Sequence, residues 1–261
     1  MYTAHQPGID RRFHQLLHRA SGRAILVHPN NGAHNRGELA VQAARGGATG
    51  VVVTHELACT FAEPLINTPL VLHIGRATMR QPGENRDALS GTIETARKDH
   101  FSAIMVPFDC TEVPGYDNTF YNFGDLIGAA YQEGMPVIAD VYVQAQEGSP
   151  GPDAYAKRVR HSARIVTELG ATAVILPYTG SRKSFATCVG DGPLERPVLV
   201  RSQPNTSILR NLQLARDAVE AGAQGVLFTS DAFAAPDAEA LTQTVQQVVH
   251  SNAVTPKIAS L

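Results

Sequence analysis

The sequence lacks several features that mark whole classes of protein. Its formal net charge is only −2 over 261 residues, and no block of like charges offers a basic surface to nucleic acid or to an anionic membrane. No apolar run is long enough to span a bilayer, and residues 1–20 carry His and Arg where a signal peptide needs an apolar stretch. We therefore expect a cytoplasmic protein that binds neither nucleic acid nor membrane, with a small molecule as its partner.

Cysteine is also scarce. The three cysteines, Cys59, Cys110 and Cys188, form no CxxC pair and have no metal-ligand spacing, so we interpret them as free thiols. The remaining composition, with 43% hydrophobic and 18% charged residues, is typical of a globular chain that can bury one large core.

One sequence motif recurs along the chain: a polar helix end, a turn of small residues and a short apolar run. It stands at residues 45–53, 98–106, 168–176 and 220–228. Glycine ends a helix in the left-handed conformation, and the apolar run that follows is typical of a strand buried on both faces. Further apolar runs at residues 24–27, 69–72, 136–141 and 197–200 bring the number of predicted strands to eight.

Amphipathic stretches separate these runs, at residues 36–45, 84–97, 124–132, 153–169, 207–221 and 238–250. Eight strands that alternate with helices over this length favour an α/β fold of the (β/α)8 TIM barrel type, and a doubly wound open sheet is the alternative. No linker divides the chain, so we expect one domain over residues 1–261. Phe13, Leu16 and Leu17 predict that residues 1–22 form an N-terminal helical cap over the barrel bottom, and residues 251–261 form a tail.

Polar residues gather where the predicted strands end, which is where barrels of this kind carry their chemistry. Burying so many polar groups without partners is costly, so they indicate a pocket, although any one of them could instead cap a helix or bind a loop amide. The catalytic candidates are Tyr142, His28, His55, His73, Asp109 and Asp140, and the substrate-binding candidates are Asn30, Asn31, Tyr178, Arg201, Ser202, Gln203, Ser230 and Asp231.

Three of these candidates, His28, His55 and His73, end consecutive strands and could share a metal ion with Asp109 or Asp140. No HxH or HExxH pattern supports such a site. We therefore assign neither metal nor cofactor, and a metal-dependent lyase stays open as an alternative.

Three longer motifs lie at residues 134–142, 168–180 and 217–225, and Pro236-Asp237 follows the last of them. They resemble the class I fructose-bisphosphate aldolases of archaeal and bacterial type. This group lies within the DeoC/LacD-like aldolase superfamily and includes amino-dideoxyheptulosonate synthases and an autoinducer-degrading thiolase. The resemblance extends over about residues 23–250. It implies a TIM barrel, and members of the group often form homo-oligomers, which we expect here too.

The resemblance also shows departures at the catalytic positions. The family's Schiff-base lysine on strand six matches Ile175, its Asp-His-Gly matches residues 30–32, and its phosphate-binding pairs match residues 202–203 and 229–230. Only the strand-five tyrosine, an acid or base in the aldolases, is kept, as Tyr142. The chain has four lysines, at positions 98, 157, 183 and 257, and of these only Lys183 could reach the mouth as a migrated catalytic amine.

These residues predict an aldolase-like enzyme that acts on a small carbonyl or enol metabolite by acid–base catalysis, without a lysine imine. Carbon–carbon bond cleavage or formation, isomerisation and cyclisation are the candidate reactions, in specialised metabolism. Tyr142 moves the proton in this hypothesis, and Arg201 binds a carboxylate in place of phosphate. An inactive homologue that binds a ligand or a partner protein is the second hypothesis.

Overall fold

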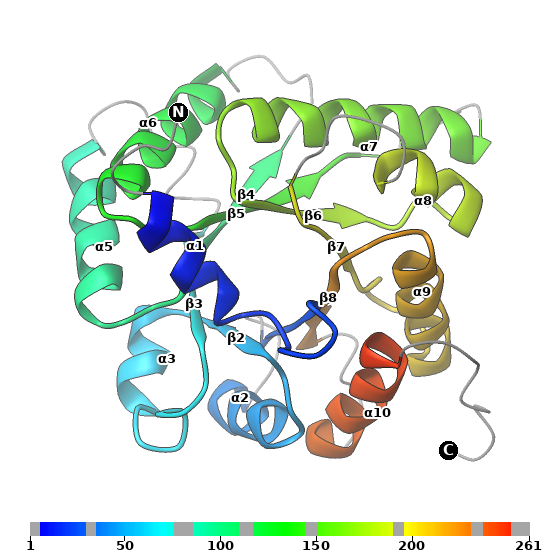
Figure 1. Ribbon diagram of the computed structural model, residues 1–261, viewed down its shortest axis with the longest axis horizontal. Coiled ribbons are helices and arrows are strands. Elements are labelled where there is room, and N and C mark those ends of the chain that lie inside the picture. Colours follow the sequence, from blue (N-terminus) through cyan, green and yellow to red (C-terminus); the bar gives the residue numbers. More distant parts are fainter. Residues whose placement is uncertain are drawn as a thin grey trace.

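A closed barrel of eight parallel strands forms the centre of the molecule (Figure 1). The computed structural model describes residues 6–29, 35–75, 86–109, 117–144, 151–189, 196–230 and 237–251. The strands follow each other around the ring in chain order, which confirms the predicted (β/α)8 TIM barrel. They are β1 (Ala24–His28), β2 (Gly50–Val53), β3 (Leu70–His73), β4 (Ala103–Asp109), β5 (Val137–Tyr142), β6 (Ala173–Pro177), β7 (Val198–Arg201) and β8 (Gly225–Thr229).

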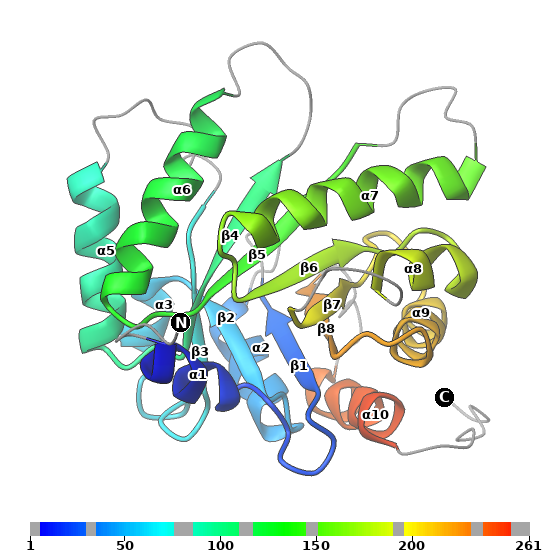
Figure 2. The same cartoon turned by 45° about the horizontal axis from the view of Figure 1, so that its top comes forward.

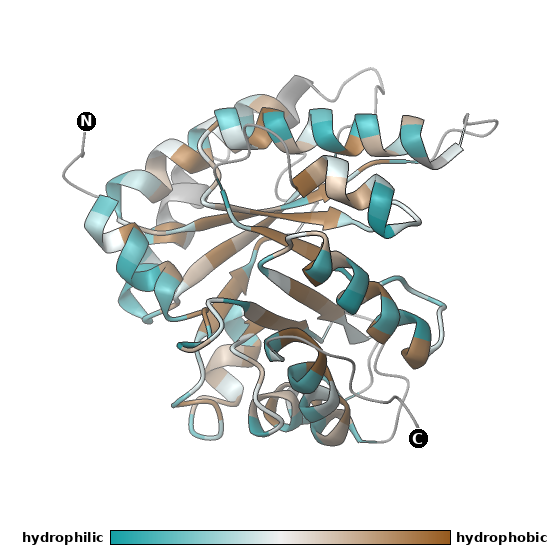
Figure 3. Cartoon of the chain, turned by 45° about the vertical axis from the view of Figure 1, so that its right-hand side comes forward, coloured by the Kyte–Doolittle hydropathy of each residue, from teal (hydrophilic) through white to brown (hydrophobic). Residues whose placement is uncertain are grey.

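Helices surround the ring (Figures 1 and 2). Their hydrophilic residues face outward, and the strands that they cover are hydrophobic (Figure 3). Two short helices, α3 and α8, were not expected from the amphipathic pattern, because they span fewer than three turns. The helices are α1 (Gln6–His14), α2 (Arg36–Arg45), α3 (His55–Thr60), α5 (Arg86–Lys98), α6 (Asp117–Gln132), α7 (Gly151–Glu168), α8 (Arg182–Val189), α9 (Ile208–Glu220) and α10 (Ala238–His250).

The turns of the recurring sequence motif adopt the expected left-handed conformation. Gly170 and Gly222 follow α7 and α9 with φ of 109° and 107°, the left-handed region that glycine enters at little cost. After α5 the corresponding turn has no glycine, and His100 takes the left-handed conformation instead, with φ of 60°. The motif therefore marks the turn from a helix into the next strand, and this turn does not require glycine at every occurrence.

Apolar side chains fill the lower part of the barrel interior. Phe13 and Leu16, which belong to α1 and the turn after it, are buried in this layer and close the amino end of the barrel. The helix expected before the first strand is present as α1, over Gln6–His14. The strands contribute Ala24, Leu26, Val52, Val71, Ala103, Met105, Ile138, Ala173, Ile175, Leu199 and Leu227.

Alternation along each strand decides what lies above this apolar layer. On β5, Ile138 belongs to the interior layer, so Asp140 and Tyr142, two and four residues further along, face the same side. The carboxyl end of the barrel therefore has a polar lining over an apolar floor. Among the described residues, none of the helices has the length and apolar character needed to cross a bilayer.

Candidate active site

The inward positions at the carboxyl ends of the strands carry charged, aromatic and hydroxyl groups. Each lies two or four residues beyond a member of the interior apolar layer, so the alternation of the strands turns it toward the barrel mouth. These residues are His28, His73, Asp109, Asp140, Tyr142, Arg201 and Thr229. Six of the seven were named from the sequence, and Thr229 had been considered there only as a departure from the phosphate-binding pair.

An ion pair between Arg201 and Asp140 forms the centre of the mouth. The Arg201 Nη1 donates to Asp140 Oδ1, and its Nη2 donates to the carbonyl oxygen of Val141 at 2.8 Å. The two charged side chains are 12% and 4% exposed. The guanidinium carbon also lies 3.9 Å from the centroid of the Tyr142 ring, which is within range of a cation–π interaction. Three consecutive residues of β5 thus hold the cation of β7 in a fixed orientation.

A pair of neutral histidines lies on the other side of the mouth. The rings of His28 and His73 are 4.5 Å apart between centroids, with 51° between their planes. Burial and, to a smaller extent, the neighbouring His73 lower the pKa of His28 to about 3. Burial also lowers the pKa of His73, against the opposing effect of the Asp140 carboxylate. Both imidazoles are therefore neutral at pH 7, and each can accept a hydrogen bond.

Backbone amides at the carboxyl ends of β7 and β8 are already engaged. The Ser202 amide donates to Leu227 O at 2.8 Å, and the Gln203 amide donates at 2.8 Å to the side chain of Asn211, which is fully buried in α9. The Thr229 amide donates to Ser202 Oγ at 3.1 Å. These three N–H groups have protein acceptors, so they do not form an open cradle for a phosphate.

A family model described as DeoC/LacD family aldolase matches residues 15–235. The chain belongs to this family of aldolases. It is 27% identical over 184 residues to the 2-amino-3,7-dideoxy-D-threo-hept-6-ulosonate synthase of Halobacterium salinarum, covering 70% of this chain and 67% of the relative. It is 24% identical over 235 residues to the 2-amino-4,5-dihydroxy-6-oxo-7-(phosphonooxy)heptanoate synthase of Streptomyces griseus, covering 88% of this chain and 82% of the relative.

The fold of a solved archaeal fructose 1,6-bisphosphate aldolase is also similar. The TM-score is 0.75 at 18% sequence identity, and the match covers 93% of this chain and 99% of the other. Such a likeness shows the shared barrel, and the chemistry has to be argued from the side chains in the mouth.

Ile175 lies in the apolar floor of this aldolase barrel. Its side chain is fully buried and belongs to the interior layer, and its Cα pairs with Asp140 on β5 and Leu199 on β7. The inward position in the middle of β6 therefore holds an aliphatic side chain directly beside the ion-paired carboxylate. Lys183, the candidate for a migrated amine, is exposed in the first turn of α8.

Two further candidates lie outside the mouth cluster. His55 begins α3, and its Nε2 lies 2.7 Å from Asp99 Oδ2 on the exposed surface. Tyr178 donates its hydroxyl to Asp217 Oδ2 on α9 at 3.0 Å, and burial together with this carboxylate raises its pKa. Ser230 is buried directly after β8. Asn30, Asn31 and Asp231 lie outside the described residues.

Tyr155 was not anticipated from the sequence. It lies in α7, and its hydroxyl donates to the carbonyl oxygen of Val143 just beyond β5, at 3.2 Å. Burial raises the pKa of its phenol, and the nearby Arg201 opposes that effect. A tyrosine inside an amphipathic helix follows the helical pattern, so no local signal could have placed it near the mouth.

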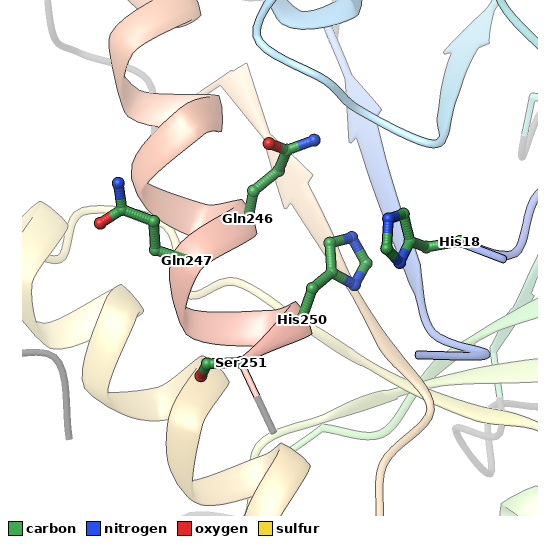
Figure 4. A pocket seen from close by; sticks show the side chains of 5 residues that line it. All are labelled: His18, Gln246, Gln247, His250 and Ser251. Carbon is green, nitrogen blue, oxygen red and sulfur yellow. The ribbon is translucent and has the colours of Figure 1, made fainter. Parts of the chain in front are cut away.

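At the opposite, amino end of the barrel a second histidine pair lines a pocket of about 460 Å³ (Figure 4). The rings of His18 and His250 stack with centroids 4.2 Å apart, and the Ser21 hydroxyl lies 2.8 Å from His250 Nδ1 and 3.2 Å from His18 Nδ1. Burial, His18 and Arg23 together lower the pKa of His250 to about 4. Within the part of the chain that the structure describes, no group of three or more His, Cys, Asp or Glu residues is arranged to hold a metal ion.

Proposed function

We propose that this protein is an aldolase-type lyase that makes or breaks a carbon–carbon bond in a small oxo acid by acid–base catalysis, without a lysine imine. The observation that carries the proposal is the buried Arg201–Asp140 ion pair, which lies against Tyr142 at the centre of the barrel mouth. The family membership supports aldol chemistry, and this cluster supports a route to it through electrostatic stabilisation.

The positions of the lysines favour such a route. An imine needs an unprotonated amine close to the substrate carbonyl. No lysine lies between Lys157 and Lys183 in the sequence, the inward side chain in the middle of β6 is Ile175, and Lys183 is exposed on α8. A substrate in the mouth therefore meets the Arg201 guanidinium rather than an amine.

Arg201 can perform the electrophilic part of the reaction. Removing a proton next to a carbonyl, or breaking the adjacent carbon–carbon bond, produces an enolate whose negative charge needs a fixed cation. Asp140 and the Val141 carbonyl hold the guanidinium by part of its donor fork. The remaining N–H groups can bind the carboxylate and the carbonyl oxygen of an oxo acid.

Tyr142 and the histidine pair can move the proton. Tyr142 lies next to the cation that would bind the substrate, so its hydroxyl is close to the atoms that gain or lose a proton. His73 is unprotonated at pH 7, and the Asp140 carboxylate, which opposes the lowering of its pKa by burial, would stabilise the ring once it has received a proton. Neutral His28 lies against it.

The engaged amides favour a carboxylate over a phosphate. A phosphate is bound well by several backbone N–H groups that point to one place, whereas the amides of Ser202, Gln203 and Thr229 each donate to a protein acceptor. Arg201 therefore remains the main anion-binding group of the mouth among the described residues, and a planar carboxylate fits its fork.

Hydrogen–deuterium exchange of pyruvate and hydroxypyruvate, followed by NMR in D₂O with the purified protein, tests this proposal. Exchange at the carbon next to the carbonyl reports enolate formation without requiring the second substrate. We expect exchange that depends on Arg201 and Tyr142, and we expect borohydride to trap no adduct. A borohydride-stable adduct on Lys183 would overturn the imine-free route, and exchange of dihydroxyacetone phosphate alone would overturn the preference for a carboxylate.

A further inference from the structure

A cysteine, a histidine and an aspartate meet on the outer surface of the barrel, away from the mouth cluster. Cys59 and His55 lie one turn apart on α3, and the Cys59 Sγ is 3.9 Å from Nδ1 and 3.8 Å from Nε2 of the His55 ring. The His55 Nε2 lies 2.7 Å from Asp99 Oδ2. Asp99 follows α5 and is 44 residues away in the sequence, so the contact is made by the fold.

These contacts place an imidazole beside the thiol, with the sulfur at nearly equal distances from the two ring nitrogens. Asp99 accepts the hydrogen of Nε2, and this leaves the lone pair on Nδ1, the nitrogen that can receive the thiol proton. A carboxylate that fixes the tautomer of a histidine next to a nucleophile is the arrangement by which proteins activate cysteine and serine. The pair is also accessible, because His55 and Asp99 are 48% and 47% exposed and Cys59 is exposed.

We propose that Cys59 is a site of thiol modification, which forms a mixed disulfide with a small disulfide-containing molecule through base assistance by His55 oriented by Asp99. The Cys59 sulfur attacks one sulfur of the disulfide, and a new S–S bond forms as the old one breaks. The thiol proton passes to His55 Nδ1 and then to the departing thiolate, so one half of the small disulfide is reduced while Cys59 is oxidised.

The second described cysteine provides a contrast within the same chain. Cys188 is buried in α8, and its thiol donates to the Ala156 carbonyl oxygen at 3.4 Å. Burial raises the pKa of this thiol to about 11. The Cys188 thiol is therefore both buried and protonated, whereas the Cys59 thiol is exposed and lies beside the base His55.

The experiment measures the rate at which oxidised glutathione modifies the full-length protein at pH 7, by intact mass and peptide mapping. A Cys110→Ser background removes the cysteine that lies outside the described residues. We expect modification at Cys59 and none at Cys188. We expect His55→Gln to slow the reaction roughly threefold to tenfold, and Asp99→Asn to slow it less, since the charge that orients the ring is lost.

A second exposed thiol on the same helix tests whether His55 is responsible for the reactivity of Cys59. Thr60 is the exposed neighbour of Cys59 on the same helix, so Thr60→Cys in a Cys59→Ser, Cys110→Ser background places a thiol at a similar level of exposure. We expect it to react at the slower rate of the His55→Gln variant. Equal rates for Cys59, for the cysteine introduced at Thr60 and for the His55→Gln variant would overturn the proposal, as would faster labelling of Cys188.

Discussion

The barrel has a pair of histidines in ring contact at each end, and the two pairs differ in their surroundings. His28 and His73 face a buried ion pair in the mouth. His18 and His250 stack around the Ser21 hydroxyl at the amino end, where Phe13 and Leu16 close the interior. Burial lowers a histidine pKa at both ends. A histidine pair with a lowered pKa is therefore no sign of catalysis by itself, and it is the adjacent Arg201, Asp140 and Tyr142 that distinguish the mouth.

The largest effect is expected from breaking the ion pair of the mouth. Asp140→Asn leaves the Arg201 guanidinium, whose side chain is 12% exposed, without its counter-charge. We expect the free energy of unfolding to fall by about 3–5 kcal/mol, as measured by urea denaturation. The exposed pair of Arg164 and Glu168 provides the control: Glu168→Gln should cost less than about 1 kcal/mol. Similar losses in both variants would mean that the central ion pair is no more than a surface contact.

Removing the hydroxyl of Tyr142 tests catalysis without breaking the cluster. Tyr142→Phe keeps a ring beneath the Arg201 cation, so we expect the exchange rate to fall about 100-fold while the apparent affinity changes little. Tyr178→Phe is the matched control, because that hydroxyl binds Asp217 on α9 instead of facing the mouth. Equal losses in rate and affinity for Tyr142→Phe would argue against proton transfer by this residue.

We expect acid to destabilise the fold through a histidine at each end of the barrel, and through the histidine of the mouth over the wider pH range. A histidine whose pKa is lower in the folded protein stabilises the fold above its unfolded pKa of 6.5, and that stability is lost as the pH falls. For His28 the loss continues to about pH 3, and for His250 to about pH 4. Thermal unfolding between pH 7 and pH 4 should therefore show a shallower decline for His28→Asn and His250→Asn than for the unchanged protein. If neither variant alters the decline of thermal stability between pH 7 and pH 4, the acid sensitivity belongs to other groups.

The smallest effect is expected at the amino end. Ser21→Ala removes the hydroxyl between His18 and His250, and we expect a loss of about 1 kcal/mol in the free energy of unfolding. The exchange rate should be unchanged, because this pocket lies at the other end of the barrel. A fall in the exchange rate without a fall in stability would show that the two ends are coupled.

The barrel could be predicted from the sequence alone, since the pattern that encodes it is local. Helix periodicity, a turn and a buried apolar run recur along the chain, and each can be recognised within about ten residues. The prediction missed α3 and α8, because helices of one to two turns leave too short a pattern. It placed most of the polar residues of the mouth correctly at strand ends, because alternation is also a local property.

Which of these polar residues come into contact could be learned only from the three-dimensional structure. Arg201 and Asp140 are 61 residues apart, and the register of β5, β6 and β7 brings them together. His55 and Tyr178 also follow strands, yet their side chains bind Asp99 and Asp217 outside the mouth cluster. A strand end specifies that a residue lies near the rim, whereas its partner depends on barrel register and on rotamer choice against distant helices, and neither is encoded in the neighbouring sequence.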